Sequence, residues 1–480
     1  MLFDSLNFAI FLPIVFVLYW YVFNKNLKVQ NFLILVASYI FYGWWDWRFL
    51  SLIVLSTLVD YSIGRALSTQ ENEFKRKALL WTSITFNLGT LGFFKYFNFF
   101  ICSLYDAVPT LQSSVGFNTL EIILPVGISF YTFQTLSYSI DVYKQKLTPS
   151  KDFIAFSAFV CFFPQLVAGP IERATHLLPQ FYRSRKINSQ QATDGLKQIL
   201  WGLFKKVVIA NNCAVFANMA FNNHADYSGI ELFIGALFFT FQIYGDFSGY
   251  SDIAIGTSKL FGFDLMKNFA TPYFSRDIAE FWRRWHISLS TWFRDYLYIP
   301  LGGSKGSKLF KVRNTFIIFI VSGLWHGANW TFVIWGALNA IYFLPLLLLN
   351  KNRSNLDIVA KGKLIPTLRE ASSMIITFCL TVLAWIFFRA NTVTDAFAIL
   401  GEIFSESLFE VPVLPIESIV TLLIVAVFLV IEWLGRESEY SIKDMFNSYP
   451  KAVRWTVYYV MIILFFGFTG GEQEFIYFQF

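Results

Sequence analysis

Residues 314–349 read NTFIIFIVSGLWHGANWTFVIWGALNAIYFLPLLLL, a run in which His326 is the only Asp, Glu, Lys, Arg or His. A membrane-spanning helix needs about 20 mostly apolar residues. The run is therefore long enough for one or two spans. An ionisable side chain within hydrocarbon costs several kcal/mol and marks a functional site by default. This stretch predicts membrane helices that carry a buried imidazole.

The composition of the whole chain agrees with this stretch. Of its 480 residues, 56% are hydrophobic, 20% are aromatic and 15% are charged, whereas soluble domains carry about 25% charged residues. No long polar segment separates the apolar runs. We therefore predict an all-α polytopic membrane protein with one membrane domain, residues 1–480.

Apolar runs recur along the whole chain and predict about 11–13 membrane segments. The run near the N-terminus has no basic stretch before it and no small-residue cleavage site after it, so we expect it to be retained. The candidate spans are 5–23, 29–43, 48–63, 79–100, 120–142, 153–169, 195–212, 229–245, 314–349 (one span or two), 370–388, 414–434 and 454–470.

Lysine and arginine alternate between the loops. Loops 64–78 and 350–369 are basic, whereas 101–119 has no Lys or Arg and 389–413 has only Arg389. Under the positive-inside rule, this pattern predicts that both termini face the outside. The modest net charge of +6 is explained by orientation and does not indicate nucleic-acid binding.

Proline and glycine interrupt several apolar runs. They lie at 125–127, Pro164, 169–170, Gly245 and Gly249. Broken helices at membrane depth are tolerated where protein or a water-filled cavity surrounds them, so we expect re-entrant segments around a central tunnel. The alternative is that these residues are simply commoner in membrane helices than in soluble ones.

His326 is the first catalytic candidate. Small residues Gly323, Gly327 and Ala328 surround it and would let a backbone or ligand approach closely. A neutral imidazole near pH 7 is a competent general base. The alternative is a structural histidine that hydrogen-bonds between helices.

His286 is the second candidate and follows Arg283 and Arg284 in the run 281–286, FWRRWH. On a helix, Arg283 and His286 would share a face, and arginine pairs could hold the phosphates of an anionic cofactor. An interfacial helix that touches anionic lipid is an equally good interpretation.

Other polar residues carry weaker signals. Asp246 and Asp252 could line a cavity or cap broken helices, and His176 and His224 fall in polar loops, where we expect ordinary surface residues. The four cysteines form no CxxC pair. We predict no metal site, because no metal-binding motif is present.

Several segments together resemble the membrane-bound O-acyltransferase superfamily, and in particular its alginate O-acetyltransferase branch. The matching segments are LPVGISFYTFQ (124–134), FPQLVAGPI (163–171), YGDFSGYSD (244–252), FWRRWH (281–286), YIPLGG (298–303), LWHG (324–327), MLF (1–3) and FIYFQF (475–480).

The resemblance implies a helical fold with a tunnel that joins a cytoplasmic donor site to an outer acceptor site in a bacterial inner membrane. It implies that His326 is the family's catalytic histidine and that His286 is the second catalytic position, which would orient groups or stabilise negative charge. Acetyl-CoA would be the donor, with no permanently bound cofactor, and Arg283 and Arg284 would hold its phosphates. An extracytoplasmic partner protein would complete the transfer to a polysaccharide. D-alanyl transfer to teichoic acid, lipid acylation and, from another class, transport remain alternatives.

Overall fold

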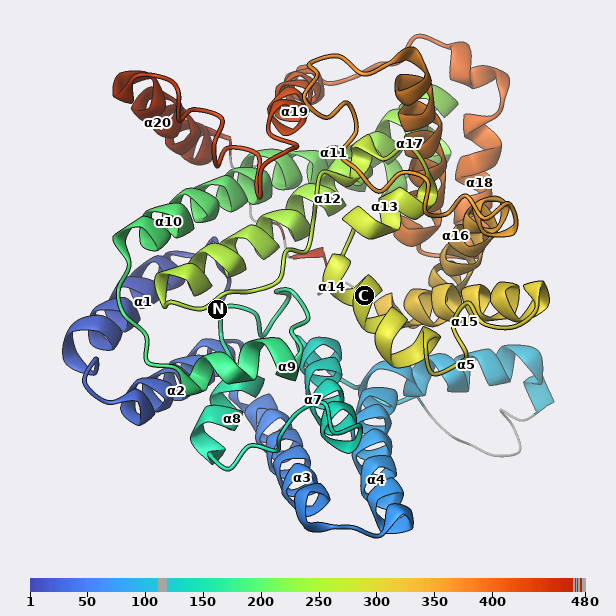
Figure 1. The fold of residues 1–480 in the computed structure, drawn as a ribbon. Helices are drawn as coiled ribbons and strands as arrows, with labels where there is room; N and C mark the ends of the chain where they lie inside the picture. The colour runs from blue at the N-terminus through green and yellow to red at the C-terminus, as the bar shows by residue number, and fades with distance from the viewer. Residues whose placement is uncertain (111–118, 469–470, 472, 474, 477–480) are drawn as a thin grey trace. The chain divides into compact units, whose positions relative to one another are not determined.

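A computed structural model describes residues 1–110, 119–468, 471, 473, 475 and 476 (Figure 1). Part of the lysine-free loop 101–119 and most of the segment 475–480 therefore lie outside the described residues. The chain divides into two compact units, Met1–Ala192 with Thr257–Met266, and Thr193–Gly256 with Lys267–Phe480.

All regular structure in the described residues is helical, as predicted. The helices of the first unit are α1 Leu6–Val17, α2 Leu27–Asp46, α3 Leu50–Thr69, α4 Glu73–Leu91, α5 Phe97–Ala107, α7 Ile128–Tyr143, α8 Phe153–Val160 and α9 Ala174–Leu177. Most or all of each remaining helix belongs to the second unit: α10 Ser189–Leu203, the π-helical turn η5 Phe204–Ala210, α11 Asn211–Asn222, α12 Gly229–Leu260, α13 Ile278–Arg284, α14 Ile287–Phe293, α15 Lys308–His326, α16 Trp330–Leu348, α17 Leu368–Arg389, α18 Val393–Ile403, α19 Ile416–Leu434 and α20 Lys451–Gly467.

Six helical stretches in the described residues are long and apolar enough to cross a membrane, fewer than the 11–13 segments predicted. Part of the difference arises because two predicted spans can form one continuous helical stretch. The six stretches are Leu27–Thr69, Ser189–Asn222, Gly229–Leu260, Trp330–Leu348, Leu368–Arg389 and Ile416–Leu434. The protein is thus a multi-pass membrane protein.

A buried carboxylate joins three helices of the first unit. Asp60 of α3 is fully buried and accepts hydrogen bonds from Ser83 Oγ of α4 (2.5 Å), Ser139 Oγ of α7 (2.6 Å) and Asn87 Nδ2 of α4 (2.8 Å). Polar side chains that bond between helices stabilise membrane bundles. This network fixes α7 against α3 and α4 (Figure 1).

The predicted interruptions at Pro164 and residues 169–170 are present. Helix α8 ends at Val160, and the backbone then continues without regular helix to α9 while remaining buried. Its polar groups find protein partners: the Phe163 N–H donates to Ser38 Oγ (3.0 Å) and Gln165 Nε2 donates to Gln134 Oε1 (2.7 Å). Irregular backbone at membrane depth requires such protein partners.

The interruptions predicted at Gly245 and Gly249 are wrong, because α12 continues through both residues. These glycines instead permit a close approach of η5 and the end of α10. A Cβ atom at Gly249 would lie 2.7 Å from the Gly202 carbonyl oxygen and 3.0 Å from the Lys206 nitrogen. Small residues allow membrane helices to pack backbone to backbone.

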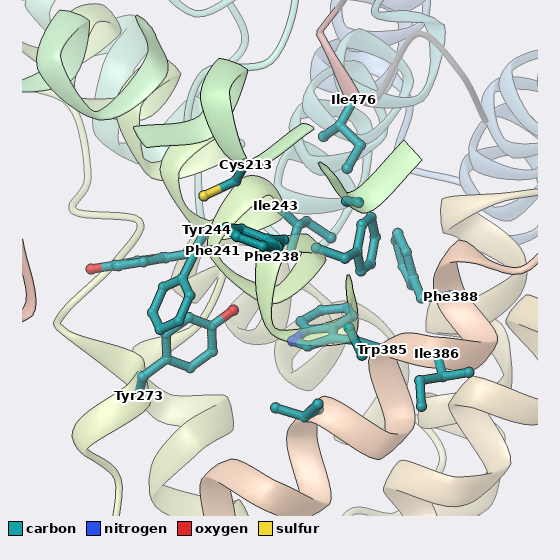
Figure 2. Close-up of a cluster of buried hydrophobic side chains, with 14 of the residues drawn as sticks. Cys213, Phe238, Phe241, Ile243, Tyr244, Tyr273, Trp385, Ile386, Phe388 and Ile476 are labelled. Atoms are coloured by element: carbon teal, nitrogen blue, oxygen red, sulfur yellow. The ribbon is translucent and has the colours of Figure 1, made fainter. Parts of the chain in front are cut away.

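Aromatic side chains fill the core of the second unit. Figure 2 shows Trp385 and Phe388 of α17 and Phe238 and Phe241 of α12 as members of one buried cluster, in which the ring centroids of Phe388 and Phe239 are 6.5 Å apart. The predicted segment 314–349 forms two helices, α15 and α16, and Gly323 packs directly against the Phe332 carbonyl at their junction. This tight hairpin sets the position of the residue that ends α15, His326.

We predict that Gly249→Ala lowers the melting temperature of the protein in detergent, because overpacking costs about 1–3 kcal/mol. The matched control is Gly401→Ala in α18, where an added Cβ has nothing within 4 Å and should stabilise the helix by about 0.5–1 kcal/mol. An equal response of the two variants would contradict the packing role of Gly249.

Candidate active site

His326 is the last residue of α15 and is only 2% exposed. Gly327 adopts an extended conformation and ends the helix there. The imidazole lies among aromatic rings, with centroids 5.0 Å from Trp325, 5.2 Å from Trp335 and 5.2 Å from Phe388. The lone imidazole of the apolar run is therefore enclosed in an aromatic, largely water-free environment.

His286 is fully buried between α13 and α14. The expected shared helix face with Arg283 is wrong, because α13 ends at Arg284 and His286 adopts a left-handed conformation with φ of +43°. Such a conformation is uncommon in a residue other than glycine and is found mainly where the surroundings enforce it. Burial lowers the pKa of His286 well below its usual range.

The second unit brings the two histidines together. Their ring centroids are 6.4 Å apart, and Trp325 contacts both rings. At this separation the ring nitrogens cannot form a direct hydrogen bond, which requires about 3 Å.

The sequence alone did not indicate the residue that holds His286. Asn268 is fully buried, and its Oδ1 lies 3.1 Å from His286 Nδ1 and accepts from Ser288 Oγ at 2.8 Å. Its Nδ2 donates to Ser251 Oγ of α12. Asn268 lies in a nonhelical segment that no quoted motif covers, so no pattern pointed to it.

Arg283 and Arg284 are both engaged with the protein itself. Arg283 donates to the carbonyls of Asn352 and Asn355, and Arg284 pairs with the buried carboxylate of Glu280 at 2.7 Å. The i, i+4 spacing of Glu280 and Arg284 is visible in the sequence and is typical of a helical ion pair. This pairing partly neutralises the charge that was predicted to meet phosphate.

An apolar cavity adjoins both histidine segments. It encloses about 840 Å³ of space, part of it open to solvent. Its wall includes Ser322, one turn before His326, and Leu289, three residues after His286, while neither histidine lines it. Arg294 and Arg353 supply its cationic groups. Sequence reasoning did not single out these two arginines as ligands.

Asp246 and Asp252 lie within α12 and cap no helix end. They form ion pairs with Lys206 (2.8 Å) and Lys205 (2.5 Å) of η5, respectively. Asp252 does line a cavity, a second and polar one of about 400 Å³ of partly solvent-open space. Its wall also includes Glu432, Lys267 and Asn268.

The other two histidines lie away from these segments. His176, expected to be an ordinary surface residue, contacts Glu172 at 2.7 Å and Asp264 at 3.5 Å within the first unit. Hydrogen bonding to Asp264 and Glu172 raises its pKa to about 10. His224 lies in a short turn and is half-buried. Within the described ranges, no cluster of three or more His, Cys, Asp or Glu could hold a metal ion.

Comparisons with known proteins agree on one family. Residues 149–388 match the model of the MBOAT, membrane-bound O-acyltransferase family. The chain is 40% identical over 409 residues to "Probable alginate O-acetylase AlgI" of Pseudomonas aeruginosa, covering 84% of this chain and 75% of that one. It is 38% identical to "Peptidoglycan O-acetyltransferase" of Helicobacter pylori, covering 81% and 77%.

A more distant similarity is to "Teichoic acid D-alanyltransferase" of Streptococcus thermophilus, 32% identical over 45% of this chain and 55% of that one. The family match, 149–388, contains both buried histidines and Asn268, which contacts His286.

We predict that Arg284→Gln lowers the free energy of unfolding by about 3 kcal/mol, because it leaves the buried Glu280 with Arg276 as its remaining ion-pair partner. The measurement is thermal unfolding in detergent. Arg353→Gln is the control, since Arg353 is exposed and its loss should change stability by no more than about 0.5 kcal/mol. Unchanged stability of Arg284→Gln with weakened acetyl-CoA binding would instead support the phosphate role.

Proposed function

The chain belongs to the membrane-bound O-acyltransferase family and is an O-acetyltransferase, and we propose that it passes an acetyl group from cytoplasmic acetyl-CoA toward an extracytoplasmic polysaccharide. The carrying observation is the pair of buried imidazoles, His326 and His286, whose ring centroids are 6.4 Å apart. Alginate-like polymers or peptidoglycan are the proposed acceptors, since those names belong to relatives that match most of the chain.

We propose that the acceptor hydroxyl binds beside the two imidazoles. An acceptor hydroxyl held there can contact both imidazoles, one of which removes its proton while the other holds the reacting oxygens. The oxygen then attacks the thioester carbonyl and the thiol leaves. The surrounding Trp325, Trp335 and Phe388 exclude water, which strengthens every polar interaction with the reacting groups.

We propose that the donor occupies the apolar cavity beside these residues. Its aliphatic and aromatic wall suits the pantetheine arm, and Arg294 and Arg353 are better placed than Arg283 and Arg284 to meet phosphate. Arg353 is exposed, and Arg294 has more than half of its side chain exposed although it pairs with Asp295. A flexible cation of this kind can reorient toward a polyanion.

We further propose that the protein lies in a bacterial inner membrane with both termini outside, and that a separate protein completes the transfer. The segments 101–119 and 389–413, predicted to be outside, are too short to form a polymer-binding domain of their own, and α18 occupies much of the second one. The same proposal includes a central tunnel and a single membrane domain. The family match supports the single domain, because it spans parts of both compact units.

Acetyl transfer is favoured over the predicted alternatives. The D-alanyltransferase match covers 45% of the chain, whereas the acetyltransferase matches cover more than 80%. Lipid acylation and transport have no comparable support.

His326→Ala and His286→Ala should each reduce acetyl transfer at least about 100-fold, as expected when a general base or a transition-state contact is lost. The measurement is the ester-linked acetate on the cell's polymer, together with the amount of protein in the membrane. His224→Ala is the control and should keep wild-type acetate. Normal acetylation by the His326 variant would refute the proposal.

Arg353→Ala should raise the KM for acetyl-CoA several-fold with little change in kcat, because it removes a contact shared by ground state and transition state. The assay uses purified full-length protein and radiolabelled acetyl-CoA.

Alone, the protein should hydrolyse the thioester slowly at most. Efficient acetylation of polysaccharide without any partner would contradict the two-protein arrangement.

A further inference from the structure

The side-chain amide of Asn268 has a fixed orientation. The backbone N–H of Ser288, which can only donate, points to Asn268 Oδ1 at 3.3 Å. On the other side, Asn268 Nδ2 donates to Ser251 Oγ at 3.0 Å. A flipped amide would set two donors against each other at Ser288. The atom that faces His286 is therefore the acceptor Oδ1.

This orientation decides which nitrogen of His286 holds the proton. Because Asn268 Oδ1 lies 3.1 Å from His286 Nδ1, the Nδ1 atom must donate. A neutral imidazole has one N–H, so Nε2 has a bare lone pair. The Nε2 atom is buried and has no hydrogen-bond partner among the described residues. The Nε2 atom can therefore accept a hydrogen bond from a ligand.

Resting on the proposed function, we propose that Asn268 is a positioning residue that fixes His286 as the Nδ1–H tautomer and makes its Nε2 the proton acceptor of acyl transfer. This assignment exchanges the roles predicted from the sequence for His286 and His326. A neutral His286 cannot donate from Nε2 to a developing oxyanion, so that task passes to His326.

The O–H bond of the acceptor hydroxyl breaks and its proton moves to His286 Nε2. The oxygen bonds to the carbonyl carbon of the acetyl thioester, and the C–S bond breaks. The departing sulfur takes the proton from the imidazolium, which restores neutral His286. Asn268 Oδ1 accepts from Nδ1 throughout and stabilises the transient cation.

The surroundings of His286 suit a neutral resting state. Its ring packs on Phe247 of α12, Phe269 and Trp325, none of which titrates. His326 of α15 is the titratable ring packed nearest within the described residues. Behind Asn268 lies the polar cavity with its charged groups Lys205, Asp252, Lys267, Glu432 and Glu439.

Nitrogen NMR of the full-length protein in lipid nanodiscs, with ¹⁵N-labelled histidine, tests the tautomer directly. The His286 signals are assigned by their loss in His286→Gln. We expect a protonated Nδ1 and an unprotonated Nε2 at pH 7. A protonated Nε2 with a bare Nδ1 would overturn the proposal.

Three variants isolate Asn268. In Asn268→Ala, part of the His286 population should convert to the Nε2–H form. An unchanged His286 tautomer in this variant would contradict the positioning role of Asn268. Asn268→Asp keeps the acceptor, so Nδ1–H should persist while the added carboxylate makes His286 protonate at higher pH; an unmoved titration contradicts the contact. Asn314→Ala, which removes a buried amide elsewhere, should leave the His286 signals unchanged.

Activity provides an independent readout. Asn268→Ala should lower kcat for acetyl transfer at least about tenfold, since a general base contributes about 10²–10⁴. The KM for acetyl-CoA should be nearly unchanged, and Asn268→Asp should restore much of the lost kcat. Acetyl transfer with the wrong tautomer would refute this inference alone. The expected tautomer without any acetyl transfer would refute the proposed function alone.

Discussion

Hydrocarbon offers no hydrogen bonds, so a polar atom buried in this chain is stabilised when it finds a partner within the protein. This constraint explains why polar residues occur in compact groups. Asp60 gathers hydroxyl and amide donors from α4 and α7. Asp252 and Lys205 neutralise each other between α12 and η5. Because each group joins two or three helical segments, satisfying the polar atoms also fixes those segments against one another.

Part of the site could be predicted from the sequence because its signal is local. His326 stands out since no other ionisable side chain occurs in its run, and burial of that run leaves the imidazole buried as well. The position of His286 could not be predicted to the same degree. Its left-handed backbone and its contact with Asn268, 18 residues away, depend on tertiary structure that no spacing rule describes.

The same limit explains the errors. Glycine in a membrane helix can mark a break in the helix or a close backbone contact. At Gly249 the nearby carbonyl of Gly202 shows that the glycine permits a close contact, and this neighbour is not visible in the sequence. The arginines illustrate a different ambiguity. Arg284 in a basic run can meet an external phosphate or an internal carboxylate, and Glu280, one helical turn earlier, provides the latter. A buried carboxylate such as Glu280 requires a cation nearby. The Arg284 guanidinium therefore pairs with Glu280 and is less available to an external phosphate.

The aromatic surroundings of His326 also bear on the difference between transfer and hydrolysis. A thioester beside a base and a water molecule would be hydrolysed, so an acetyltransferase must admit an acceptor hydroxyl while excluding water. Trp325, Trp335 and Phe388 lie within about 5 Å of the imidazole and offer a water molecule few polar contacts. The bare Nε2 of His286 is then the acceptor that a hydroxyl must satisfy on entry. An aromatic site of this kind favours a hydroxyl held by its own binding contacts over a mobile water molecule.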